Sequence, residues 1–235
     1  MSKTERAFLI LERLTSGKPA PTHAELMREL GVQRSTLSDS LAELRDLGYV
    51  IVQDRRYLPG ARLLTFVRRA CFHDDLAAAI RPSLVSLRDA TKETAVWVME
   101  DGRRVDTSGV VVAVDQVESE HPIRYVAAIG VPYMMHRTAA GHAFLAFTGR
   151  SAHVVAGADG FDPVELDQEL ERVRGRGFAL RVEPGTGTAI AGPVHDKNGT
   201  LMGVISIVGP TARLGDVESR VWPVLQAEIG RLSGS

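Results

Sequence analysis

Cysteine is almost absent from this 235-residue sequence, which contains only Cys71. A single cysteine excludes an internal disulfide and a zinc site built from cysteines. The seven histidines show no HExxH motif and no other short-range ligand spacing, so we expect no metal ion and no cofactor. Long hydrophobic runs are also missing, since no apolar stretch of about 18 residues and no signal peptide is found. We therefore expect a cytoplasmic protein that does not contact a membrane.

Sequence motifs of common enzymes are missing as well. The glycines form no phosphate-binding loop and no GxGxxG pattern. Ser206 lies in the stretch GVISIVG, which differs from the GxSxG nucleophile motif. Cys71 lies in an apolar stripe, so we expect a core or interface residue rather than a nucleophile. The sequence therefore predicts that the protein is not an enzyme.

An excess of charge of one sign is also lacking, because the formal net charge is −1. Residues 1–62 hold ten Lys and Arg against eight Asp and Glu, which leaves eighteen against twenty-one for residues 63–235. Hydrophobic residues make up 44% of the chain, as in an ordinary globular protein. The length favours two domains, of which the first is slightly basic.

The most informative pattern that is present lies near the N-terminus. Thr22 and Glu25 form a capping box at the start of a short helix, and Gly31 supplies the permissive backbone of a tight turn. A second helix is predicted over residues 34–46. Its leucines recur at helical spacing and form one apolar stripe: Leu37, Leu41 and Leu44.

A two-stranded wing is predicted to follow the second helix. Residues 49–52 and 57–58 would form its strands, with Arg55 and Arg56 at the turn between them. An upstream helix over residues 4–15 would complete the core with Phe8, Leu11 and Leu14. These elements predict a winged helix-turn-helix, whose second helix enters the major groove of DNA. A helical hairpin with only a structural role remains the alternative, because it shares the same spacing.

The exposed face predicted for the second helix favours DNA binding. Its side chains are small and mostly polar: Ser35, Thr36, Ser38, Asp39 and Ala42. Small side chains allow close approach to phosphates and base edges, and the helix N-terminus offers N–H groups to a phosphate. Because the basic bias is modest, we expect affinity to depend on dimeric presentation and a few phosphate contacts.

The pattern changes beyond residue 60. Residues 61–79 are predicted to form a linker helix that supports a dimer contact. Its apolar side carries Leu64, Val67, Cys71 and Leu76. A separate helix is predicted over residues 83–91, after a break at Pro82. We therefore predict three parts, which are a DNA-binding domain at 1–60, a linker at 61–79 and a larger domain at 80–235.

The larger domain alternates between strand and helix patterns. Strands are predicted over residues 94–100, 110–114, 123–129, 189–194 and 201–208. Helices are predicted over residues 136–147, after the capping residue Asp162, and along Val217, Val221, Leu225 and Ile229. The sum is an α+β fold in which helices flank an antiparallel sheet, and it is large enough for a ligand pocket.

Stretches along nearly the whole chain resemble the IclR family of bacterial transcriptional regulators. In the first part these are ERAFLILERL, AELMRELGVQRSTL and LAELRDLGYV. In the second part they are IRYVAAIGVPYMMHRTAAGHAFLAF, RVRGRGFAL and AIAGPVHDKNGTLMGVISIVGP. The resemblance implies a homodimer or homotetramer that places paired winged helices on double-stranded, palindromic operator DNA. It also implies a GAF/PAS-like domain that binds a small organic acid or an aromatic metabolite as effector.

The resemblance also assigns residues to these two sites. The family's DNA contacts fall at Gln33, Arg34, Ser35, Thr36 and Ser38. Further candidates for DNA contact are Thr22, Asp39, Arg55 and Arg56. The family's effector-lining positions fall at or near Met134, Arg137, Ala140, Gly141, Arg181, Ala189 and Ser206. Their neighbours complete the predicted effector site, and these are Thr138, Ala139, His142 and Ile190.

The recognition helix departs from the family pattern. Ser38 and Asp39 stand where the family usually carries a large polar residue and an arginine. A carboxylate repels phosphate and can accept a hydrogen bond from cytosine N4. Either the operator differs from the family's usual one, or Asp39 points elsewhere.

The predicted pocket departs as well. Arg137 stands where the family commonly has cysteine, and Arg181 falls at or near its usual acidic position. Two guanidinium groups near one cavity suit an anionic effector with a carboxylate or a phosphate. Alternatively, the arginines point to solvent or pair with Glu183 or Glu165. A third possibility is a degenerate pocket, in which case the protein acts mainly as a dimerising DNA-binding protein.

Overall fold

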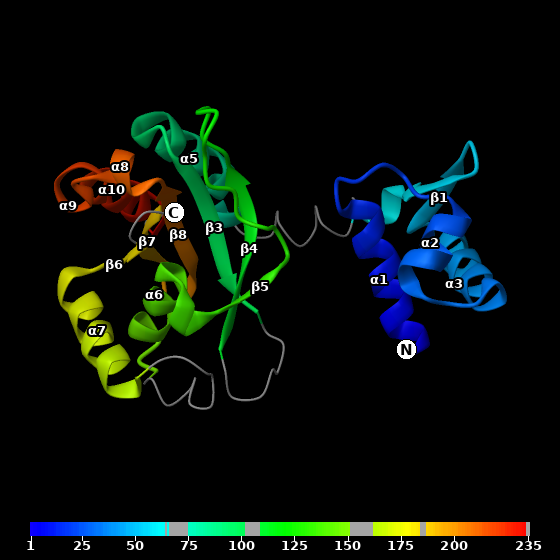
Figure 1. Ribbon diagram of the computed structural model, residues 1–235, viewed down its shortest axis with the longest axis horizontal. Coiled ribbons are helices and arrows are strands. Elements are labelled where there is room, and N and C mark those ends of the chain that lie inside the picture. The colour runs from blue at the N-terminus through cyan, green and yellow to red at the C-terminus, as the bar shows by residue number, and fades with distance from the viewer. Residues whose placement is uncertain (64, 66–74, 102–108, 151–161, 184–186, 234–235) are drawn as a thin grey trace. The chain divides into compact units, whose positions relative to one another are not determined.

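The chain forms two compact units, Met1–His73 and Asp74–Ser235. The computed structural model describes residues 1–63, 65, 75–101, 109–150, 162–183 and 187–233 (Figure 1). Each unit has its own hydrophobic core. Within the described ranges, no helix combines the length and the apolar character needed to cross a bilayer.

The N-terminal unit consists of a helical part and a β-hairpin (Figure 1). Its elements are α1 Lys3–Thr15, α2 His23–Leu30, α3 Arg34–Asp46, β1 Val50–Gln53 and β2 Arg56–Pro59. The predicted capping box of α2 is present, since the Thr22 side chain accepts from the Glu25 N–H. Gly31 ends α2 in the left-handed conformation, with φ of 63°, and turns the chain into α3.

The core of this unit is formed by all three helices and the first strand. Its buried side chains are Ile10, Leu14, Leu26, Leu37, Leu41, Leu44 and Val50. The expectation that Phe8 belongs to this core is wrong, because Phe8 is 62% exposed. Ile10 and Leu14 lie one turn apart on α1 and define its buried side, from which Phe8 points away.

The C-terminal unit is built on an antiparallel sheet with the strand order β5-β4-β3-β8-β7-β6 (Figure 1). The first strands along the chain are β3 Thr94–Glu100, β4 Val110–Val117 and β5 Pro132–Met134. The later strands are β6 Ala179–Glu183, β7 Gly187–His195 and β8 Leu201–Gly209. The central pair of β3 and β8 joins the two halves of the sheet.

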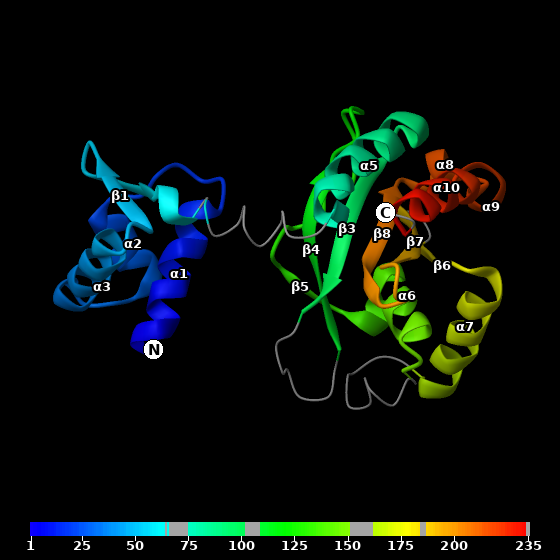
Figure 2. The same cartoon turned by 180° about the vertical axis from the view of Figure 1, so that it is seen from behind.

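Helices cover both faces of this sheet (Figures 1 and 2). One face packs against α5 Asp75–Thr91 and α10 Trp222–Ser233. The other face packs against α6 Ala139–Phe147, which in turn contacts α7 Pro163–Arg176. Short helical turns complete the unit, namely η1 Met135–Arg137, α8 Thr211–Leu214 and α9 Val217–Arg220. The predicted α+β fold with a flanked antiparallel sheet is therefore present.

Side chains alternate between the two faces along each strand. On β8, Ile205 belongs to the core below α5 and α10, whereas Val204 belongs to the core below α6. On β7, Ile190 lies in the first core and Ala191 in the second. This alternation determines which residues can face a ligand on the α6 side.

Two helix boundaries differ from the sequence prediction. The expected break at Pro82 is wrong, because α5 runs through it to Thr91. The α5 side chains Ile80, Leu84 and Leu87 are buried at helical spacing, and this burial offsets the backbone hydrogen bond that proline removes. The last predicted helix is divided, since α9 ends at Arg220 and α10 begins at Trp222. The linker helix predicted over residues 61–79, with Leu64, Val67 and Cys71, falls largely outside the described residues.

The prediction of a strand over residues 123–129 is wrong. These residues belong to the connecting segment, residues 118–131, which joins β4 to β5 without regular structure. The backbone of this segment forms hydrogen bonds with the side chain of Gln116 rather than with a neighbouring strand. Gln116 Nε2 donates to the Ala127 carbonyl at 3.1 Å, and the Ala127 N–H donates to Gln116 Oε1 at 2.9 Å.

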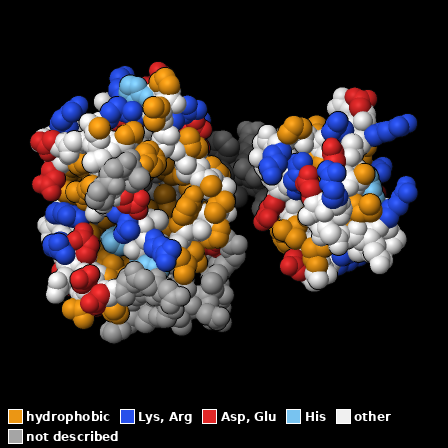
Figure 3. All heavy atoms as spheres, in the orientation of Figure 1, with side chains coloured by type: hydrophobic (Ala, Val, Ile, Leu, Met, Phe, Trp, Pro, Cys, Tyr) orange, Lys and Arg blue, Asp and Glu red, His pale blue; other side chains and the backbone are white. Residues whose placement is uncertain are grey.

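Further side chains anchor the middle of the connecting segment. Thr94 Oγ1 donates to the Tyr125 carbonyl at 2.7 Å, and Arg213 Nη2 donates to the Ile123 carbonyl at 3.0 Å. Arg213 also forms an ion pair with the buried carboxylate of Glu93. Figure 3 shows hydrophobic side chains gathered over this region, and Ile123 is 77% exposed.

Candidate DNA-binding face and ligand cavity

The exposed face of α3 lies opposite its buried stripe. Leu37 is buried, whereas Ser35, Asp39 and Ala42 are exposed on the other side of the helix. The N-cap residue, Gln33, makes no side-chain capping bond to the described chain. The first backbone N–H groups of α3 are therefore available to an anionic partner such as a phosphate.

The predicted DNA-site residues differ in exposure. Those exposed are Gln33, Arg34, Ser35, Ser38, Asp39, Arg55 and Arg56, and those half-buried are Thr22 and Thr36. Thr22 is occupied by its capping role, because its N–H and its hydroxyl donate to Glu25 Oε2 at 2.7 and 2.9 Å. These two hydrogen bonds, the backbone one first, hold the pKa of Glu25 below its ordinary value.

The two arginines of the wing have different surroundings. Arg56 Nη1 donates to the Ala20 carbonyl at 2.6 Å and lies 3.7 Å from a carboxylate oxygen of Glu25. Arg55 lies at the tip of the β1–β2 turn, where Asp54 and Arg55 have φ values of 50° and 61°. The wing therefore presents Arg55 outward and turns Arg56 back onto its own unit.

His23, the first residue of α2, was missed as part of this face by sequence reasoning. Its Nε2 lies 3.0 Å from Ser38 Oγ, and its ring packs against Tyr57 with ring centroids 6.3 Å apart. The bond joins α2 to the exposed face of α3. The available signal was the position of His23 directly after the N-cap, where a helix-turn-helix approaches the DNA backbone.

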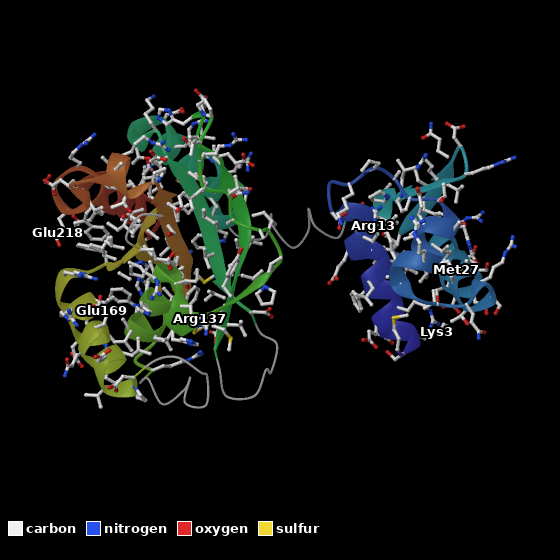
Figure 4. The ribbon with its side chains drawn as sticks, viewed as in Figure 1. Lys3, Arg13, Met27, Arg137, Glu169 and Glu218 are labelled. Carbon is white, nitrogen blue, oxygen red and sulfur yellow. The ribbon has the colours of Figure 1, made fainter. Side chains whose placement is uncertain are left out.

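Charge on the N-terminal unit is mixed rather than uniformly basic. On the face shown in Figure 3, acidic side chains lie among the Lys and Arg side chains. Ion pairs join Lys3 to Glu43 and Arg13 to Glu29, and Figure 4 labels both basic residues on α1. The unit therefore offers a partner a few separated basic side chains rather than a uniformly basic surface.

The C-terminal unit contains a cavity of about 560 Å³ on the α6 side of the sheet. This volume lies in the range of about 300–1,000 Å³ that is typical of small-molecule sites. Apolar side chains of the strands form much of its lining, namely Val96, Val98, Val111, Ala113, Ala189 and Val208. Its polar lining consists of Tyr125, Tyr133, Arg137, Thr138, Arg181, Glu183, Thr188 and Ser206.

The structure brings most of the predicted effector residues to this cavity. Those that line it are Met134, Arg137, Thr138, Ala139, Ala140, Arg181, Ala189 and Ser206. Three others do not line it. Ile190 is fully buried on the opposite face of the sheet, and His142 is buried beneath η1. Gly141 packs against the backbone of Met135, where an added Cβ would lie 2.1 Å from the carbonyl oxygen.

The two arginines predicted for the pocket both line the cavity. Arg181 Nε lies 3.4 Å from Glu183 Oε1, and the Arg181 side chain is 38% exposed. Arg137 is exposed just before α6, where Figure 4 labels it, and its Nε donates to His136 Nε2 at 3.3 Å. Both arginines therefore line the cavity, and Arg181 is at the same time paired with Glu183.

Two buried histidines, His136 and His142, lie in η1 and α6, the elements that supply Arg137 and Ala140 to the cavity. His142 Nε2 is 2.9 Å from the His136 carbonyl oxygen, so this nitrogen must donate. Burial lowers the pKa of His142 below its ordinary value, and it also lowers the pKa of His136, with a further contribution from the charge of Arg137. Both imidazoles are therefore held in the neutral form near neutral pH.

The connecting segment contributes cavity residues that sequence reasoning did not identify. Tyr125 lies over the start of β7, where a Cβ on Gly187 would approach the Tyr125 ring to 2.6 Å. Glycine at this position lets the tyrosine close one side of the cavity. The sequence signal was hidden, because residues 123–129 have the alternation of a strand.

A winged-helix unit joined to a sheet unit with a ligand-sized cavity defines a class of proteins, the DNA-binding regulators that carry a ligand-sensing domain. Within the described residues, no cluster of His, Cys, Asp or Glu could hold a metal ion. Residues 4–54 match the sequence profile of the IclR helix-turn-helix domain, and residues 69–229 match that of the bacterial transcriptional regulator IclR C-terminal domain. The chain belongs to the IclR family of transcriptional regulators and is not an enzyme.

Individual relatives agree with this assignment. The chain is 26% identical over 225 residues to the transcriptional repressor IclR of Escherichia coli K12, covering 90% of this chain and 81% of that protein. The fold is similar to that of an IclR regulator from Alicyclobacillus acidocaldarius, with a TM-score of 0.73, 23% identity and coverage of 99% and 97%. An IclR homologue from Microbacterium hydrocarbonoxydans, complexed with 4-hydroxybenzoate, gives a TM-score of 0.78, 18% identity and coverage of 99% and 98%.

Proposed function

We propose that this regulator binds operator DNA through α3 and the wing, and that a small anionic molecule in the cavity controls the affinity. The observation that carries the proposal is the composition of the cavity, which combines an apolar lining with two arginines. Apolar strand residues suit a hydrocarbon or aromatic body. Guanidinium groups suit a carboxylate, to which arginine can donate two parallel hydrogen bonds.

The chemistry of the effector can be narrowed further. Tyr125 and Tyr133 add aromatic surface to the apolar lining, which favours a planar ring over a short acid. The 4-hydroxybenzoate bound to the homologue from Microbacterium hydrocarbonoxydans supports an aromatic acid as the first probe. We therefore propose an aromatic or otherwise bulky carboxylic acid, with Arg137 and Arg181 as its anion-binding residues.

For the DNA-binding face we propose Arg34, Ser35, Ser38 and Arg55 as direct contacts, because all four are exposed. The first turn of α3 would add its backbone N–H groups. We also propose a homodimer or homotetramer, which would place two winged helices on a palindromic operator. As a regulator of chromosomal DNA, and by its likeness to a repressor, it would act as a cytoplasmic repressor.

A second candidate function is a dimerising DNA-binding protein with a degenerate pocket. The observation in its favour is the proximity of Glu183 to Arg181, which partly neutralises the charge offered to an anion. In that case the cavity would bind no effector, and operator affinity would not respond to small molecules.

Two measurements separate these candidates. Genome-wide footprinting of the bound DNA would identify the operator and the neighbouring genes. A thermal-shift screen of carboxylic acids, beginning with 4-hydroxybenzoate, would then be run with and without the operator duplex. Saturable stabilisation together with changed operator affinity supports the effector-controlled regulator. Normal operator binding without any response across the acids supports the degenerate pocket.

A further inference from the structure

The recognition helix carries a carboxylate at the centre of its exposed face. Asp39 is the sixth residue of α3 and projects, with Ser35 and Ala42, opposite the buried stripe that includes Leu37. Because both neighbours are small, they leave the carboxylate free to approach a surface that lies against the helix. The N-terminal half of a recognition helix is the part that contacts base edges.

Among the described acidic residues of its unit, Asp39 belongs to those that have no side-chain partner. Glu25, Glu29 and Glu43 each form an ion pair with a basic side chain. For Asp39, no hydrogen bond or ion pair is found with any residue that the structure describes. Its acceptor capacity is therefore available to the DNA.

We propose that Asp39 is a specificity-determining residue that accepts a hydrogen bond from N4 of a cytosine in the major groove. The proposal rests on the DNA-binding face described above. Cytosine N4 is a donor, and the neighbouring C5 position carries no acceptor, so a carboxylate can approach it. Cytosine N4 has one adjacent acceptor, O6 of the paired guanine. Adenine N6 also donates, but it lies between two acceptors, N7 of its own ring and O4 of the paired thymine, which repel a carboxylate more strongly.

The same charge acts against other bases at this position. Guanine presents O6 and N7, and thymine presents O4 and a methyl group, so neither offers a donor to Asp39 in the major groove. When DNA covers the carboxylate and the facing base offers no donor, the carboxylate loses its hydration and gains no hydrogen bond in return. Asp39 would therefore select cytosine both by its hydrogen bond and by rejecting acceptor bases.

Selection of binding sites from random DNA duplexes tests the assignment with the full-length protein. We would compare wild type, Asp39→Ala, Asp39→Asn and the control Asp46→Asn. Asp46 is also an exposed acid on α3 but lies seven residues later, about 10 Å along the helix axis. All four proteins would be checked for unchanged thermal unfolding, since both aspartates are exposed.

We expect the wild type to select cytosine at one position of each half-site, with roughly a 5- to 100-fold loss of affinity for another base there. Asp39→Ala should lose the preference at that position alone. Asp39→Asn should shift it toward adenine, which pairs with an asparagine amide, and Asp46→Asn should leave it unchanged.

A different result would overturn the proposal. If both Asp39 variants select the wild-type sequence and bind every duplex more tightly, Asp39 only repels phosphates. If the wild type enriches no sequence at all, the DNA-binding face itself is wrong and the assignment of Asp39 falls with it. If the wild type enriches a sequence motif and both Asp39 variants enrich the same motif, the role of Asp39 in specificity is contradicted, whereas the DNA-binding face is not.

Discussion

Arg55 and Arg56 are adjacent at the tip of the wing but have different surroundings. Arg56 is bonded to the Ala20 carbonyl and faces Glu25, whereas Arg55 projects from the turn. Substitution of each arginine should therefore separate a side chain that stabilises the fold, Arg56, from one that is available to contact DNA, Arg55. This pair provides a matched comparison in the same hairpin.

We expect Arg55→Ala to weaken operator binding and to reduce the salt dependence of affinity by about one unit of log–log slope, because one phosphate contact is lost. Arg56→Ala should instead lower the free energy of unfolding of the N-terminal unit by about 1 kcal/mol, since the Ala20 carbonyl loses its donor. Fluorescence anisotropy over a salt series and urea unfolding measure the two effects. Equal loss of DNA affinity without loss of stability in both variants would contradict the distinction.

His142 gives the C-terminal unit a pH-dependent stability. Burial lowers its pKa in the folded state, so the unfolded chain binds the proton more readily below the ordinary value of 6.5. The free energy of unfolding should therefore fall as the pH is lowered through 6.5 toward the folded-state pKa. His142→Gln, which keeps a donor for the His136 carbonyl, should lose less stability over this range.

Urea unfolding at pH 7.5, 6.5 and 5.5 would measure this difference. Because His136 is also held neutral, the variant should retain part of the pH dependence. An identical decline in wild type and variant would show that His142 does not contribute.

Two helical glycines of the C-terminal unit have opposite roles. In α6, Gly141 lies against the Met135 backbone, so an added Cβ would meet the carbonyl oxygen at 2.1 Å. In α7, an added Cβ on Gly175 would meet no atom within 4 Å. The first glycine is required by close packing, and the second only weakens its helix.

We therefore expect Gly141→Ala to reduce the free energy of unfolding by roughly 2–4 kcal/mol, since the backbone of η1 and α6 must separate. Gly175→Ala should raise it by about 0.5–1 kcal/mol, because alanine is the better helix former. Thermal and urea unfolding of both variants would give the sign of each effect. Destabilisation by Gly175→Ala would contradict the open environment at that position.

Sequence reasoning succeeded where local rules decide the structure. The helix predicted over residues 34–46 and the strand over 94–100 coincide with α3 and β3, because leucine spacing and strand alternation specify them locally. It failed over residues 123–129, whose conformation depends on Gln116 and other side chains that are distant in sequence. Alternation of apolar residues cannot reveal that the backbone of the segment forms hydrogen bonds with a side chain instead of with a strand.

The cavity shows a similar division. Arg137 and Arg181 could be assigned to it because resemblance to a family preserves positions along the chain. Ile190 was assigned beside Ala189, although successive residues of a strand face opposite sides of the sheet. That alternation alone, applied to β7, excludes Ile190 from a site that contains Ala189. The contribution of Tyr125 depended on the course of the connecting segment and could not be read from its own sequence.

The whole protein combines two compact units whose sites would be thermodynamically linked. If an effector changes operator affinity by a given factor, the operator must change effector affinity by the same factor. We expect this equality for any acid that passes the thermal-shift screen. Calorimetric titration of the acid into free protein and into the operator complex would measure the factor, and equal acid affinities in the two titrations would contradict the linkage between the sites.

The anchors of the connecting segment have a consequence for how such a protein can change. Gln116, Thr94 and Arg213 all hold backbone atoms of the segment and none of its side chains. Tyr125, which faces the cavity, can therefore be exchanged without removing any of these anchors. Mutation could alter the chemical preference of the sensor in small steps while its scaffold stayed unchanged, so new effectors would be accessible to it at little risk to folding.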